Sequence, residues 1–161
     1  MSKGKVLVTG ACGYIGSHTW TDLLANGFEV VGLDNFSRSS PEILKGIEKI
    51  SGKKPINHKI DLRDEWQLND FFEKEKNIDA IVHFAAFKSV GESVQYPLRY
   101  FENNVGGMIN LLKQVEKRDI KNFVFSSSCS VYGNAKKMPV TEETELAKAE
   151  SPYARTKQIC E

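Results

Sequence analysis

Short runs of β-branched and aromatic residues alternate along this chain with longer segments of helical pattern. Val, Ile and Phe dominate the runs, and most of the runs are continuously apolar rather than alternating. Such runs are typical of strands buried on both faces, as in a parallel sheet. The predicted strands are Lys5–Thr9, Glu29–Leu33, Ile56–Ile60, Asp79–Phe84 and Asn122–Ser126.

The gaps between the runs carry signals for the start and the end of helices. Ser or Asp precedes several of the predicted helices, and proline stands in the first turn of some. Both features favour the amino terminus of a helix. The predicted helices cover 14–26 with Gly27 as the stop, a segment opened by Ser40-Pro41, then 66–76, 97–117 and a last segment opened by Ser151-Pro152. Asp64 and Gln67 resemble a capping box for the third of these helices.

Strand and helix therefore alternate five times, which predicts an α/β fold with a doubly wound parallel sheet. Parallel strands need crossover connections, and these are right-handed. In such sheets ligands bind beyond the carboxyl ends of the strands, where the strand order reverses. The polar residues that follow each strand are thus the candidates for function.

A glycine-rich turn, Thr9-Gly10-Ala11-Cys12-Gly13-Tyr14-Ile15-Gly16, follows the first strand and opens the first helix. Its three glycines have the spacing GxxGxxG. The first permits a tight turn, the second lets a pyrophosphate approach the backbone, and the third lets helix and strand approach each other. Free N–H groups and the helix dipole then favour an anion. The P-loop alternative requires GxxxxGK[ST], which this turn does not have.

Asp34 ends the second strand, 18 residues beyond Gly16, where a carboxylate can accept hydrogen bonds from an adenosine ribose. The same charge repels a 2′-phosphate, so NAD is favoured over NADP. Arg38 lies close in sequence and is the alternative determinant, because arginine can accommodate that phosphate. Asp34 can also be explained as a loop-capping residue.

Tyr153 and Lys157 stand four residues apart on the last predicted helix and so share one face. A tyrosine with its usual pKa of about 10 is a poor base at neutral pH, and a neighbouring ammonium lowers that value. This arrangement predicts a general base for a sugar hydroxyl. A pair at this spacing is more often an ordinary surface pair. The glycine turn and the serines after the fifth strand, Ser126 to Ser130, strengthen the catalytic interpretation.

Five stretches together carry a family resemblance: VLVTGACGYIGSHT, LDNFSRSS, HFAAFKSVGESVQYPLRYFENNV, FVFSSSCSVYG and SPYARTK. On these the chain resembles the extended short-chain dehydrogenase/reductase family and, within it, the UDP-glucose 4-epimerases, also called UDP-galactose 4-epimerases. The resemblance implies a Rossmann-like NAD-binding domain and the NAD-dependent interconversion of UDP-galactose and UDP-glucose at carbon 4. It further implies a homodimer of galactose metabolism, and the three widely separated cysteines lead us to expect a reducing, cytoplasmic compartment.

The resemblance also implies a role for individual residues. Those expected to bind the cofactor are Gly10, Gly13, Tyr14, Ile15, Gly16, Asp34, Asn35, Ser37, Asp61, Leu62, Phe84, Ala85, Ala86, Lys88, Asn103, Ser126, Tyr153 and Lys157. Those expected to meet the substrate are Lys88, Ser128, Cys129, Ser130 and Tyr153. Ser128, Tyr153 and Lys157 are the expected catalytic residues. Asp61 can instead cap a helix, Lys88 can be a solvated lysine, and Asn103 can be an ordinary helical residue that is easily confused with Asn104.

Other functions remain open at this stage. Related 4,6-dehydratases carry Thr-Asp-Glu after the fifth strand, whereas this chain has Ser128-Cys129-Ser130 and no carboxylate there. Another NAD-dependent nucleotide-sugar epimerase and a non-catalytic NAD-binding fragment are further alternatives. The family is about twice as long, so residues 1–161 are expected to be the amino-terminal part of the enzyme, without its substrate-binding part.

Charge and cysteine content exclude some classes of partner. The 22 basic and 21 acidic residues nearly cancel, which gives no reason to expect nucleic acid, and no apolar run approaches a membrane span. Cys12, Cys129 and Cys160 form no CxxC, and His83 is expected to pack inside its strand. We therefore expect no disulfide framework and no metal site.

Overall fold

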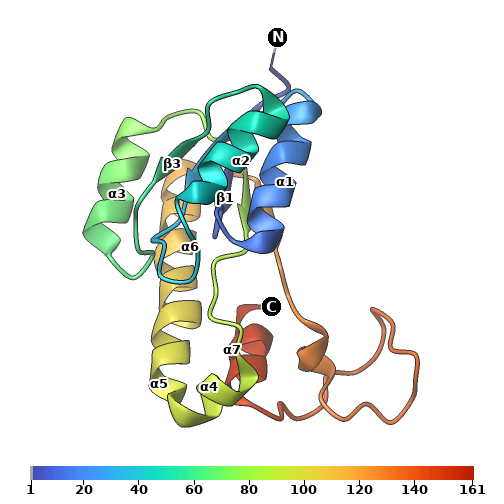
Figure 1. Ribbon diagram of the computed structural model, residues 1–161. Coiled ribbons are helices and arrows are strands. Elements are labelled where there is room, and N and C mark those ends of the chain that lie inside the picture. Colours follow the sequence, from blue (N-terminus) through green and yellow to red (C-terminus); the bar gives the residue numbers. More distant parts are fainter. Residues whose placement is uncertain (1) are drawn as a thin grey trace. The chain divides into compact units, whose positions relative to one another are not determined.

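The computed structural model describes residues 2–161, and within them five strands form one parallel sheet (Figure 1). The strand order is β3-β2-β1-β4-β5, so the direction of winding reverses at β1. The strands are β1 (Lys5–Thr9), β2 (Glu29–Leu33), β3 (Ile56–His58), β4 (Ala80–His83) and β5 (Asn122–Phe125). The predicted doubly wound parallel sheet is confirmed, with the reversal between β2 and β4 on either side of β1.

Side chains of the central strands alternate between two apolar layers because successive residues of a strand point to opposite faces. Val6 and Val8 of β1 pack with Trp20 of α1 (Tyr14–Ala25) and Ile47 of α2 (Glu42–Ser51). Leu7, between them, packs on the other face. There it meets buried residues of α3 (Glu65–Lys74) and α6 (Gly107–Arg118), among them Phe72 and Leu111. Helices thus cover both faces of the sheet.

The chain divides into two compact units. The first unit runs to Ala85 and resumes over Asn110–Ser126, and it contains the whole sheet. The second comprises Ala86–Ile109 and Ser127–Glu161. Its elements are α4 (Val90–Gln95), α5 (Pro97–Tyr100), the π-helical segment η1 (Phe101–Gly106), the 3-10 turn η2 (Cys129–Tyr132) and α7 (Pro152–Cys160). That residues 1–161 act as one NAD-binding domain stays a prediction.

Several predicted boundaries are wrong for local reasons. β3 ends at His58 rather than Ile60, because the Ile60 N–H turns back to the His58 carbonyl at 3.0 Å. The third helix covers Glu65–Lys74 rather than 66–76, since Glu75 takes an extended conformation. The second helix begins after Pro41, which occupies the capping position predicted for Ser40. β4, β5 and α1 are each shorter than predicted by one residue at one or both ends.

The helix predicted over 97–117 is not one regular α-helix. α5 passes into the π-helical turn η1 and then into α6, which ends at Arg118. At the transition the Gly107 N–H bonds to the carbonyl of Glu102, five residues back, which is the wider π pattern. The sequence prediction also missed α4 and η2, both of which are six residues or shorter and carry no long apolar pattern.

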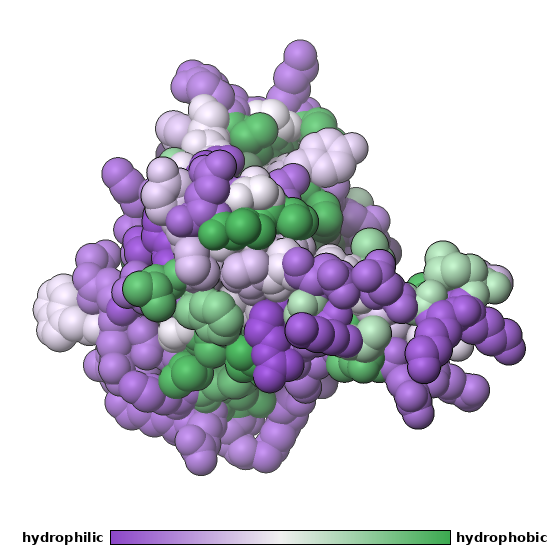
Figure 2. All heavy atoms as spheres, turned by 90° about the horizontal axis from the view of Figure 1, so that it is seen from below, coloured by the Kyte–Doolittle hydropathy of each residue, from purple (hydrophilic) through white to green (hydrophobic). Residues whose placement is uncertain are grey.

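Figure 2 shows one face of the molecule, on which hydrophilic residues predominate and hydrophobic residues form separate small groups. Individual large apolar side chains are exposed on several helices, including Trp66 of α3 and Leu98 of α5. Among residues 2–161, every helix is too short or too polar to cross a bilayer.

Candidate active site

The glycine turn after β1 has the geometry that its spacing predicts. Gly10 has a φ of +65°, and a Cβ there would lie 2.7 Å from the backbone nitrogen of Ala85. A Cβ at Gly16 would lie 2.2 Å from the Gly10 carbonyl oxygen, so this residue permits close packing of helix on strand. At Gly13 the nearest atom is 3.2 Å away, which leaves mild crowding only. Gly13 is therefore the glycine of the three that the surrounding protein crowds least.

The amino terminus of α1 suits an anion. Its capping position is Gly13, no side chain accepts a hydrogen bond from its first turn, and that turn contains no acidic residue. Tyr14 and Ile15 are exposed by 80% and 57%. Unpartnered N–H groups at such a terminus, together with the helix dipole, are the features that bind phosphate. The residues here thus fit the pyrophosphate of a dinucleotide.

Asp34 lies beside this turn at the carboxyl end of β2. Its carboxylate accepts hydrogen bonds from the Cys12 N–H at 2.9 Å, from the Phe36 N–H at 2.8 Å and from the Ser39 hydroxyl at 2.8 Å. Asp34 is thus a loop-organising residue as well as a candidate ribose ligand. The two interpretations are compatible, because carboxylate oxygens together offer about four acceptor sites.

A second polar group connects the ends of β2 and β3. The Asn35 side-chain amide donates to Asp61 at 2.9 Å, and Arg63 forms two hydrogen bonds with the same carboxylate, at 2.9 and 2.7 Å. Arg63 is the main reason that the pKa of Asp61 falls to about 2, with Asn35 a smaller contributor. The Ser37 N–H bonds to the Asn35 side chain at 2.9 Å, and Leu62 is buried.

The remaining predicted site residues of the first unit follow β4 and β5. The Phe84 N–H bonds to the Thr9 carbonyl at 3.1 Å and the Ser126 N–H to the His83 carbonyl at 3.2 Å. These contacts bring Phe84, Ala85 and Ser126 to the same sheet edge as Gly10. His83 is 2% exposed and shares a 2.6 Å hydrogen bond with the Thr9 hydroxyl, so the predicted core histidine is confirmed.

In the second unit, Ser128 caps the turn η2. Its hydroxyl oxygen accepts from the Ser130 hydroxyl at 2.9 Å and from the Ser130 N–H at 3.2 Å. Because both bonds use the oxygen as acceptor, the Ser128 hydrogen is left to donate elsewhere. Cys129 is an exposed free thiol in the same turn.

Tyr153 and Lys157 lie on α7, which Ser151 caps by accepting the Ala154 N–H at 3.1 Å. The two side chains are 9% and 5% exposed. The Tyr153 ring makes an edge contact with Tyr100, whose centroid is 6.5 Å away. Burial lowers the pKa of Lys157 from its usual value. The helix thus holds a phenol and an amine in a fixed relation on one buried face, as general base catalysis requires.

The remaining predicted residues of the second unit have less definite surroundings. Ala86 is half-buried and Lys88 is exposed. Asn103 is half-buried and donates to the Asn104 side chain at 2.9 Å. Asn104, which in the sequence is only the neighbour that can be confused with Asn103, is 4% exposed, and its side chain bonds to both backbone groups of Phe87. Its position in a π-helical turn was not readable from sequence.

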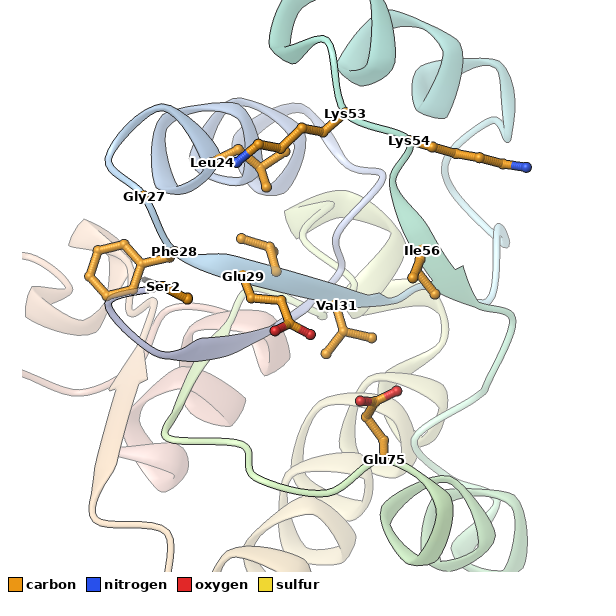
Figure 3. Close-up of a pocket in the computed structure, with 11 residues that line it drawn as sticks. Ser2, Leu24, Gly27, Phe28, Glu29, Val31, Lys53, Lys54, Ile56 and Glu75 are labelled. Carbon is orange, nitrogen blue, oxygen red and sulfur yellow. The ribbon is translucent and has the colours of Figure 1, made fainter.

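A hollow of about 480 Å³ lies in the first unit, at the amino ends of β2 and β3 (Figure 3). The carboxylates of Glu29 and Glu75 point into it, and the apolar side chains of Val31 and Ile56 also line it. None of the predicted site residues lines it. Parallel sheets bind ligands at the carboxyl ends of their strands, so we do not equate this hollow with the active site. Within residues 2–161 no three His, Cys, Asp or Glu side chains are grouped so as to hold a metal ion.

The chain is similar in sequence to curated proteins. A UDP-glucose 4-epimerase of Schizosaccharomyces pombe is 47% identical over 163 residues, which are 99% of this chain and 45% of the relative. The UDP-glucose 4-epimerase of Bacillus subtilis is 46% identical over 156 residues, covering 97% of this chain and 45% of that protein. The chain therefore spans about half the length of the curated relatives it matches.

A solved structure is also similar to this chain. The UDP-glucose 4-epimerase of Bifidobacterium longum, in complex with NAD+ and UDP, superimposes with a TM-score of 0.93 at 42% identity. The match covers 97% of this chain and 46% of that one. Residues 6–161 also match the NAD dependent epimerase/dehydratase family. The resemblance predicted from the sequence is thus confirmed, and the chain belongs to the NAD dependent epimerase/dehydratase family.

Proposed function

We propose that this chain provides the cofactor-binding and acid–base residues for the interconversion of UDP-galactose and UDP-glucose. The observation that carries the proposal is the pair Tyr153 and Lys157, buried together on the capped helix α7. The sequence identity to UDP-glucose 4-epimerases supports UDP-galactose and UDP-glucose as the substrates. The hydroxyl of Ser128, which is left to donate a hydrogen bond, supports acid–base chemistry on a sugar oxygen.

Tyr153 acts as the base. In the tyrosinate form it takes the proton from the 4-hydroxyl of the sugar, and it returns that proton when the 4-keto sugar is reduced again. The positive charge of Lys157 stabilises the tyrosinate. Ser128 donates its free hydrogen to the sugar oxygen. NAD, when bound, supplies the acceptor and then the donor of the hydride at carbon 4.

Cofactor binding is the role of the first unit together with part of the second. We assign the pyrophosphate to the amino terminus of α1 after Gly13, and the adenosine ribose to Asp34. Asn35, Ser37, Asp61 and Leu62 border the adenosine end. The other residues assigned to NAD are Phe84, Ala85, Ala86, Lys88, Asn103 and Ser126.

The substitution Tyr153→Phe in the complete natural protein tests the proposal. Removing the phenol oxygen should lower kcat by about 100-fold or more, because general base catalysis contributes roughly that much. Bound NAD should be retained. Tyr96→Phe is the matched control, since Tyr96 is an exposed tyrosine of the same unit. Epimerisation by Tyr153→Phe at the rate of the Tyr96→Phe protein would refute the base assignment.

The proposal extends to assembly and location. We propose a homodimer in the cytoplasm, as in the family that the sequence resembles. Cys12, Cys129 and Cys160 are free thiols, which suits a reducing compartment. Sedimentation of the complete protein measures the assembly state directly.

A further inference from the structure

Gln158 follows Lys157 on α7, and its side-chain amide connects three segments of the second unit. The amide nitrogen donates to the Val131 carbonyl and to the Ala147 carbonyl, each at 2.7 Å. Val131 lies in η2, three residues after Ser128. Ala147 lies in the long loop that runs from η2 to α7 (Figure 1).

One bonded carbonyl, that of Val131, lies in η2 just before the loop begins, and the other, that of Ala147, lies near the end of the loop. At one end Gly133 packs so closely on the other that a Cβ there would lie 2.5 Å from the Lys148 carbonyl. Both amide hydrogens of Gln158 are used, and its oxygen accepts from Arg155 at 3.3 Å. Val131 is 2% exposed, so its carbonyl would find no easy replacement partner in water.

Successive residues of a helix are about 100° apart around its axis, so Gln158 and Lys157 face different directions. Gln158 therefore has no place among the reacting groups that the proposed function names. Its contacts instead set how η2, capped by Ser128, sits against the helix that carries Tyr153 and Lys157. Acid–base groups must be held to within about 0.5 Å of their productive positions.

We propose that Gln158 is a positioning residue for this reaction, which sets the distance of the Ser128 hydroxyl from Tyr153 by joining α7 to η2 and to the end of the loop. The inference rests on the proposed function for its catalytic consequence. The structural part of the inference is that Gln158 joins η2, the loop and α7. We call this arrangement the junction, and it rests on the two hydrogen bonds alone.

The kinetic test uses the complete natural protein with Gln158→Met, which keeps the length of the side chain and removes both donors. It should lower kcat about tenfold and change KM less than about twofold, since geometry rather than ground-state binding is lost. Gln158→Lys keeps N–H donors at similar reach and should recover most of kcat. Gln95→Met, at an exposed position of α4, is the control and should not change kcat.

A double-mutant cycle tests whether the effect passes through Ser128. In the Ser128→Ala background, Gln158→Met should have little further effect on kcat, because the hydroxyl that it positions is absent. Equal losses in both backgrounds would overturn the proposal, as would a wild-type kcat in Gln158→Met or a Gln158→Lys protein no better than Gln158→Met.

Hydrogen exchange provides a readout that does not need activity. Gln158→Met should speed amide exchange over 128–133 and 147–151, and leave the first unit as in the Gln95→Met protein. Unchanged exchange over those two segments would overturn the junction itself. If the wild-type protein fails to interconvert the two UDP-sugars, the proposed function fails, and the exchange data still decide the junction.

Discussion

The carboxylate of Asp34 accepts a hydrogen bond from the backbone N–H of Cys12, with 2.9 Å between nitrogen and oxygen. This bond joins the carboxyl end of β2 to the glycine turn after β1. Burial raises the pKa of the Cys12 thiol to about 12, and the negative charge of Asp34 contributes to the same shift. The thiol in the turn is therefore neutral at physiological pH.

Asp34→Ala should weaken NAD binding and relax the discrimination against NADP, because the repulsive carboxylate is gone. It should also lower the free energy of unfolding by about 2 kcal/mol, since the nearly buried carboxylate accepts three hydrogen bonds. Asp34→Asn keeps one acceptor oxygen and should cost less stability. Titration with both nucleotides and urea denaturation measure the two effects. Tighter NADP than NAD binding to the unmodified chain would show that Arg38 sets the preference.

The three glycines of the turn should differ in their response to alanine. Gly10→Ala and Gly16→Ala should destabilise the fold strongly, because the added Cβ meets backbone at 2.7 and 2.2 Å. Gly13→Ala has its closest contact at 3.2 Å and should stay folded while it loses most of its affinity for NAD. Thermal melting and NAD titration separate these outcomes.

Gly46→Ala is the matched control for this series. Gly46 lies inside α2, and no atom stands within 4 Å of an added Cβ. The substitution should stabilise the protein by about 0.5–1 kcal/mol through helix propensity and leave NAD binding unchanged. Loss of NAD affinity in Gly46→Ala equal to that in Gly13→Ala would contradict a specific role for the turn.

Asp61 should titrate far below an ordinary carboxyl. Its pKa is about 2 in the folded chain against 3.8 for the unperturbed group, chiefly because of Arg63. The folded state therefore gains stability from this group above about pH 4 and loses it as the pH falls toward 2. Both side chains are partly exposed, so the gain is under about 1 kcal/mol. In Arg63→Gln the pKa measured by NMR should rise toward 3.8; an unchanged value would contradict the pairing.

Strand β5 is the last strand of the sheet within residues 2–161, and Val124 on it is 58% exposed. Unpaired apolar edges invite association. The isolated chain should therefore self-associate at high concentration, and Val124→Lys should shift sedimentation toward the monomer. Ile50→Lys, which places the same charge at an exposed position of α2, is the control. Equal effects of the two lysines would show that charge alone governs solubility.

The apolar runs predicted the sheet well because continuous burial leaves a clear pattern in sequence. β1 and β2 have the predicted bounds, and the glycine turn after β1 contacts Asp34 after β2 through the Cys12 N–H. A parallel sheet brings all carboxyl strand ends to one edge, so candidate site residues can be proposed from their position after each strand.

Contacts between side chains and distant backbone were not predictable in the same way. The amide of Gln158 bonds to carbonyls 27 and 11 residues away, and every residue has a carbonyl. Arg63 likewise lowers the pKa of Asp61 through two hydrogen bonds, which depend on the side-chain conformation of Arg63. The π-helical turn around Asn104 adds a residue per turn without any composition that marks it.

The position of β1 between β2 and β4 has a consequence for the order in which the chain folds. β1 and β2 are joined by a connection of about 20 residues, whereas β4 must reach β1 across a much longer separation, as in the Thr9–His83 hydrogen bond that spans 74 residues. Loop-closure entropy rises with that separation, so local pairing comes first. We therefore expect the pairing of β1 with β2 to form before that of β1 with β4, so that the glycine turn and Asp34 are brought together early in folding.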